Sequence, residues 1–310
     1  SWLNDKATSE TRGRVFALYT AVAWAMSGVG PLGLNLKDPN GTILFALITV
    51  VMVSAIIPLA LTTVGNPEIG HRTHFGIRRL YKISPVGVLA CFSSGIVNTA
   101  IFGLLPVYCN KLGYSNAQIS IILSVSVLAG FVIQFPIGWL ADSLGRRPLM
   151  LGTTIVALAL SVWIVNLPDD RFLWLVGLTF ALTGMISPLY GLGVGQTNDY
   201  IERKDFVGAS AGLLFAWGIG ASIGPAVAAP AMTQFGPHGL FYFVTAYHGA
   251  LATFILYRML VRRALRAKEQ GNFVAVPVTQ ATYGAPELDP RCEPQVAPAT
   301  ASKVISETVD

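Results

Sequence analysis

Charged residues are absent from seven long stretches of this chain, and the stretches predict its secondary structure. No Asp, Glu, Lys or Arg occurs in residues 15–36, 39–67, 83–110, 112–141, 148–168, 172–198 and 206–257. A helix needs about 20 mostly apolar residues to cross the hydrocarbon core of a bilayer. Each of the first six stretches therefore predicts one membrane-spanning helix.

The seventh stretch is too long for a single membrane-spanning helix. Near its middle lie residues 235–239 (FGPHG), and Gly and Pro together favour a turn over a continued helix. A turn there divides the stretch into two helices. The pattern as a whole predicts an all-α polytopic membrane protein with eight transmembrane helices.

The basic residues give these helices a direction. Of the 21 Lys and Arg, 16 fall in the connections on one side, two in the C-terminal tail, and only Lys37, Lys111 and Arg171 on the other side. Because basic residues gather on the cytoplasmic side, both termini are predicted to be cytoplasmic. Connections that face anionic lipid also account for the net charge of +5, so no nucleic-acid partner is expected.

The connection between the fourth and fifth expected helices carries a distinctive motif. Residues 138–148 read GWLADSLGRRP, with Gly138, Asp142, Gly145, Arg146 and Arg147 at fixed spacing. A tight turn with Arg anchors at lipid headgroups would explain the arginines and Gly145 but not Asp142. The pattern G-x-L-a-D-x-x-G-R-R resembles the cytoplasmic signature loop of the major facilitator superfamily of transporters. The resemblance implies a secondary transporter that moves a small molecule by alternating access.

Two parts of the chain resemble each other at an offset of 194 residues. Asn4-Asp5 and Gly30-Pro31 recur as Asn198-Asp199 and Gly224-Pro225. Between them run two ridges of small residues that allow close helix packing: Gly13, Ala17, Ala21 and Ala25, then Gly208, Gly212, Ala216 and Gly220. Such repeats are typical of transporters with duplicated halves.

Within the resemblance, the eight helices are similar to family helices five to twelve. Residues 1–66 would then end the N-terminal half, 67–82 form a cytoplasmic linker, 83–262 form a six-helix C-terminal half, and 263–310 form a disordered cytoplasmic tail. The opening residues 1–5 (SWLND) are similar to the YcaD-like branch of the family. Because family helices one to four are missing, we expect this piece alone to be inactive in transport.

Asp142 is the sharpest candidate for a conformational gate. The resemblance implies that its carboxylate docks on the positive N-terminal end of the first helix, around residues 11–14, and keeps the cytoplasmic side shut. Arg146, four residues further on, could hold Asp142 in place. We expect Asp142→Asn to favour the inward-open state. Labelling of single cysteines on both faces would test this, and unchanged labelling would contradict it.

The resemblance places the substrate cavity between the third and sixth helices. The candidate residues are hydroxyl and amide side chains: Ser94, Asn98, Thr99, Thr179, Thr183, Ser187 and Tyr190. In the alternative interpretation, Ser and Thr bond to their own backbone or to neighbouring helices. Gly30-Pro31 and Gly224-Pro225 resemble the glycine–proline element of antiporters, which favours efflux or antiport of a drug, sugar or metabolite.

No expected helix contains Asp or Glu, the usual carriers of coupled protons. If protons are coupled to transport, His248 is the fallback, although packing is its expected role.

Cys91, Cys109 and Cys292 lack the spacing of a metal site, and we expect no cofactor. A membrane enzyme stays open as an alternative, but the charged loops of this chain contain no arrangement of a nucleophile beside a base. A non-transporting receptor or assembly factor also stays open. The expected location is the inner or plasma membrane.

Overall fold

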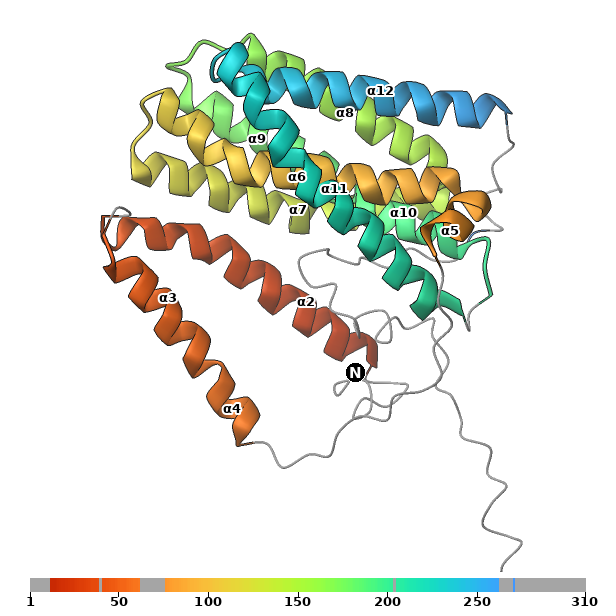
Figure 1. Cartoon of the computed structure of the whole chain (residues 1–310), viewed down its shortest axis with the longest axis horizontal. Helices are drawn as coiled ribbons and strands as arrows, with labels where there is room; N and C mark the ends of the chain where they lie inside the picture. Colours follow the sequence, from red (N-terminus) through yellow and green to blue (C-terminus); the bar gives the residue numbers. More distant parts are fainter. Residues whose placement is uncertain (1–11, 39–40, 62–75, 203–204, 262–269, 271–310) are drawn as a thin grey trace, which may run out of the picture.

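The structure, a computed structural model, describes residues 12–38, 41–61, 76–202, 205–261 and 270. In this part of the chain every regular element is helical (Figure 1). The predicted all-α fold is therefore confirmed. The expected tail at 263–310 and most of the expected linker lie outside the described residues, apart from Gln270 and residues 76–82.

The C-terminal part of the chain is a bundle of long apolar helices. Its elements are α6 (Pro85–Lys111), α7 (Asn116–Leu144), α8 (Arg146–Val165), α9 (Phe172–Ile186), α10 (Leu189–Asn198), α11 (Phe206–Gln234) and α12 (Gly239–Val261). With α9 and α10 taken together, six helices there are long and apolar enough to cross a membrane. Gly236 has a φ of 73° in the predicted turn between α11 and α12, a conformation that glycine adopts without strain.

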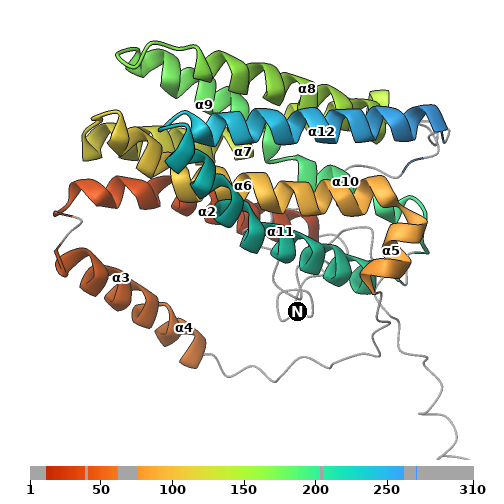
Figure 2. The same cartoon turned by 45° about the horizontal axis from the view of Figure 1, so that its top comes forward.

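The N-terminal part supplies two further helical segments. The first is α2 (Arg12–Val29), which continues as the 3-10 helix η1 (Gly30–Asn35). The second is α3 (Ile43–Ser54) with α4 (Ile56–Ala60), a shorter apolar helix. Figures 1 and 2 show α3 and α4 standing away from the α6–α12 bundle, whereas α2 packs on α7. These segments correspond to the first two expected spans.

A short helix, α5 (Ile77–Ile83), lies within the expected linker. Its Leu80 side chain is fully buried in a cluster with Val88 of α6 and Leu213 of α11. Figure 1 shows α5 at the same end of the bundle as the start of α6 and the end of α12. The end of the linker is therefore packed against the bundle, which the composition of the linker did not indicate.

Glycines bring α6 and α11 into backbone contact. A Cβ atom added at Gly95 of α6 would overlap the carbonyl oxygen of Trp217, and one at Gly220 of α11 would overlap the carbonyl oxygen of Phe92. A Cβ atom at Gly224 would likewise overlap the carbonyl oxygen of Ile96. Small residues at such positions let membrane helices pack by van der Waals contact. The predicted packing ridge is thus in close contact at Gly220.

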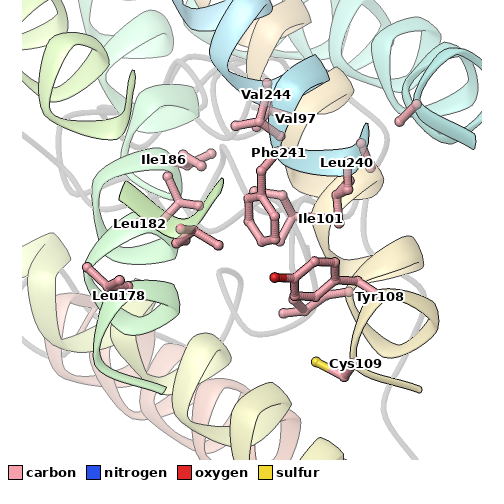
Figure 3. Close-up of a cluster of buried hydrophobic side chains, with 14 of the residues drawn as sticks. Val97, Ile101, Tyr108, Cys109, Leu178, Leu182, Ile186, Leu240, Phe241 and Val244 are labelled. Carbon is pink, nitrogen blue, oxygen red and sulfur yellow. The ribbon is translucent and has the colours of Figure 1, made fainter. Parts of the chain in front are cut away.

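The largest core cluster of the described residues joins α6, α7, α8, α9, α11 and α12, and Figure 3 shows part of it. The rings of Tyr108 and Phe241 meet edge to face, with centroids 4.9 Å apart. Figure 3 shows Leu182 and Ile186 of α9 to the left of the Phe241 ring and Leu240 of α12 to its right. The cluster fixes these helices against one another around the candidate site.

The outer surface of the bundle is apolar in a way that suits lipid. Large side chains such as Leu173 and Trp139 are mostly exposed. The exposed rings of Trp163 and Trp174 lie 6.0 Å apart near the connection between α8 and α9. Trp is enriched at membrane–water interfaces, so this pair fits one edge of a bilayer. With the six apolar helices, this surface shows an integral membrane protein.

Candidate functional site

The charged loop is a sharp turn between α7 and α8. The last turn of α7 ends at Gly145, whose N–H donates to the carbonyl of Ala141 at 3.1 Å. Gly145 has a φ of 87°, so a residue with a side chain would be strained there. Gly138 is buried in α7 and Asp142 is exposed on its final turns. The structure describes no side chains for residues 11–14, so the docking of Asp142 stays a prediction.

Arg146 opens α8 and is buried, with 1% of its side chain exposed. It forms an ion pair with Asp199, and its Nη1 also donates to the carbonyl oxygen of Gly195 at 3.0 Å. A cation is unfavourable at the start of its own helix but favourable at the C-terminal end of α10, where carbonyl groups lack helical partners. The ion pair therefore ties the signature loop to the end of α10.

Arg147 extends this connection. Its Nη2 donates to the hydroxyl of Tyr200 at 3.0 Å, and its guanidinium lies 5.8 Å from the centroid of the Tyr200 ring. We call Arg146, Arg147, Asp199 and Tyr200 the charged cluster. The sequence motif contains both arginines, whereas Asp199 was predicted only as part of the internal repeat and Tyr200 was not predicted. The available signal was the position of Asp199 directly after the sixth uncharged stretch.

Asn98 lies halfway along α6 on a side that its neighbours only partly cover. Its amide nitrogen donates to the carbonyl and the hydroxyl of buried Ser94, at 2.9 and 3.0 Å. Among the described residues, nothing donates to the Oδ1 of Asn98. Thr99 beside it donates to the carbonyl of Ala221 at 3.0 Å and so joins α6 to α11. The structure thus joins Asn98 to Ser94 and Thr99 to α11, and among the described residues the Oδ1 of Asn98 accepts no hydrogen bond.

The candidates on α9 have different surroundings. Thr179 is buried and donates to the carbonyl of Leu175 at 2.8 Å, within its own helix. Thr183 is buried and donates to the carbonyl of Ser126 in α7 at 2.9 Å. These contacts favour packing for both threonines, as the alternative interpretation held. The ring of Tyr190 is also buried, in the cluster that holds Leu80. No described contact tests a cavity role for them.

Ser187 marks a break in the sixth span. It caps α9, and α10 begins at Leu189 after Pro188. Proline has no N–H to donate to the preceding turn, so Pro188 weakens the helix at this point. The half-buried Ser187 hydroxyl lies against Gly130 of α7. Of the candidates on this span, Ser187 alone lies both at the break and outside the fully buried set.

The two glycine–proline pairs have different environments. Gly224 packs on the α6 backbone and Pro225 lies inside α11. Gly30 begins η1 with Pro31, and no described atom lies within 4 Å of an added Cβ there. His248 is buried in α12, where its Nδ1 lies 2.8 Å from the carbonyl of Val244. That contact agrees with the expected packing role for His248.

Comparisons with known proteins agree with this architecture of apolar helices and a glycine-marked, charged turn. The chain matches the Major Facilitator Superfamily over residues 87–286, more than half its length, and it belongs to this family. It is similar to proteins named "Uncharacterized MFS-type transporter YcaD" from Shigella flexneri serotype 5b (strain 8401) and Escherichia coli (strain K12 / DH10B). Both are 29% identical to it over 269 residues, which cover 85% of this chain and 67% of each relative. The predicted YcaD-like branch is confirmed, and the family indicates a transporter rather than an enzyme.

Proposed function

We propose that this chain is part of a secondary active transporter that moves a drug, sugar or metabolite by alternating access, in efflux or antiport. Family membership supports transport across a membrane. We also propose that residues 1–66 end one half of the transporter and residues 83–262 form the other half, joined through 67–82. Both termini would face the cytoplasm of a cell with this protein in its inner or plasma membrane.

The observation that carries this proposal is the Oδ1 of Asn98, which accepts no hydrogen bond from the described residues. An amide oxygen kept from any hydrogen-bond donor costs about 1–3 kcal/mol in proteins. Lipid supplies no donor at the middle of a bilayer. An acceptor held in place by Ser94 at that depth is therefore best explained by contact with water or with a polar substrate. Asn98 would accept from a hydroxyl or amine of the transported molecule.

The charged cluster would serve as the hinge of the cytoplasmic gate. In the proposed cycle Asp142 docks on the first helix, while Arg146 and Asp199 hold the signature loop on α10. Because α10 continues the broken span, a movement of the loop would reach Ser187 and its neighbours. Proton coupling is part of the proposal only through His248, whose buried position makes it a secondary candidate.

Asn98→Leu should lower substrate flux about fivefold or more, because the loss of one buried hydrogen bond costs about 1–3 kcal/mol. The measurement is flux of labelled sugars, amphipathic cations and metabolites into proteoliposomes that contain this chain within its complete transporter. Gly152→Ala is the matched control, because no described atom lies within 4 Å of an added Cβ there. Equal flux in both variants would contradict a role for Asn98 at the substrate site.

A further inference from the structure

Two side chains from different parts of the chain share one space beside Gly130 of α7. A Cβ atom added at Gly130 would lie 2.7 Å from the hydroxyl oxygen of Ser187 and 2.9 Å from Cη2 of Trp24. Both distances are shorter than ordinary van der Waals contact. We call this space the Gly130 notch. It exists because residue 130 has no side chain.

Trp24 reaches the notch from α2, in the N-terminal part of the chain. The side chain is buried, with 8% of the residue exposed, and its ring lies 6.4 Å from that of Phe131. Among the described residues its indole N–H has no hydrogen-bond acceptor. Packing, rather than a directional bond, therefore sets the position of the ring, so it can slide along α7 if α2 moves.

Ser187 reaches the same notch from the break between α9 and α10. The neighbouring turn is locked to α7, because Thr183 donates to the carbonyl of Ser126 and the Ile133 side chain fills the space beside Gly184. The hydroxyl of Ser187 therefore sits where the fixed end of α9 meets the bend. A change in the bend angle would move Ser187 within the notch.

We propose that Trp24 and Ser187 form a mechanical coupling across Gly130, through which a shift of α2 against α7 changes the bend between α9 and α10. Interior side chains pack too densely for two of them to move independently in one small space. Further along the same seam, Gly28 packs under Leu128 and Asn35 donates to Ser120 at 2.8 Å, which keeps α2 on α7. Trp24 is thus a positioning residue that acts through Ser187.

Spin labels can measure this coupling without any substrate. Met26 of α2 and Phe135 of α7 are both exposed, and a label at each reports the distance between the two helices. The labels go into the full chain in liposomes, with Cys91, Cys109 and Cys292 replaced by alanine. Ser187→Leu should shift the main distance peak when Trp24 is present. In a Trp24→Ala background the same substitution should leave the peak in place.

The control is Ser222→Leu, the same substitution at an exposed position of α11, which should not shift the peak. Gly130→Ala is a milder second perturbation of the notch and should also shift it. The proposal is overturned if Ser187→Leu and Gly130→Ala both match the control, or if both shifts persist after Trp24→Ala. The proposed coupling rests on the proposed transport cycle, in which it would act. The distances between the spin labels do not depend on flux, so either proposal can fail alone.

Discussion

Arg146→Ala should lower the free energy of unfolding by about 3–5 kcal/mol, because it removes one charge of a buried ion pair and leaves the Asp199 carboxylate in place. The side chains of this pair are 1% and 2% exposed, so water cannot replace the lost charge. The loss also removes the hydrogen bond to Gly195 at the end of α10. The change would be measured by titrating the purified protein in detergent micelles with SDS and monitoring its helical content.

The chain offers a matched control for this pair. Arg171 and Asp170 are 3.8 Å apart but 60% and 80% exposed, so Arg171→Ala should cost less than about 0.5 kcal/mol. Arg146→Met combined with Asp199→Leu should recover part of the stability, since neither charge of this pair is then buried without the other. A loss from Arg146→Ala no greater than that from Arg171→Ala would show that the ion pair does not hold the loop on α10.

Gly220→Ala should lower the free energy of unfolding by about 2–3 kcal/mol, as expected for an overpacked interior. The added methyl group would overlap the carbonyl oxygen of Phe92 in α6. Backbone atoms cannot rotate aside as a flexible side chain can, so α6 and α11 would have to separate. The same SDS titration measures the effect.

Gly218 provides the comparison for Gly220 within the same helix. No described atom lies within 4 Å of an added Cβ at Gly218, so Gly218→Ala should leave stability unchanged or raise it by up to about 1 kcal/mol through helix propensity. The expected result is a large difference between two identical substitutions that are two residues apart. Equal effects would mean that α6 and α11 do not pack backbone to backbone at Gly220.

Most of the helix positions could be predicted from the sequence because the boundary of each span is chemical. A charged residue ends a membrane segment, and residues 235–239 mark a turn because Gly and Pro disfavour a continued helix. The helix α5 was missed for a physical reason as well. Seven residues give too short a pattern, and Leu80 is buried only because α6 and α11 lie beside it.

The candidate site was harder to predict than the helices. Helical spacing shows which side chains share a face of a helix, but not what that face meets. Thr179 and Thr183 share a face that turns out to be buried against backbone carbonyls. The roles of Asp199 and Trp24 in the site were missed because their partners, Arg146 and the Gly130 notch, are distant in sequence. Pairing across helices requires the packing of the bundle.

A single cysteine at Asn98 tests alternating access most directly. In a background with no other cysteine, a membrane-impermeant maleimide would be added to right-side-out and to inverted vesicles that contain the complete transporter. Position 98 lies at the middle of α6, so a protein that opens to each face in turn exposes it to both. We predict labelling in both vesicle orientations. Labelling in only one orientation, or in neither, would contradict the proposed transport mechanism.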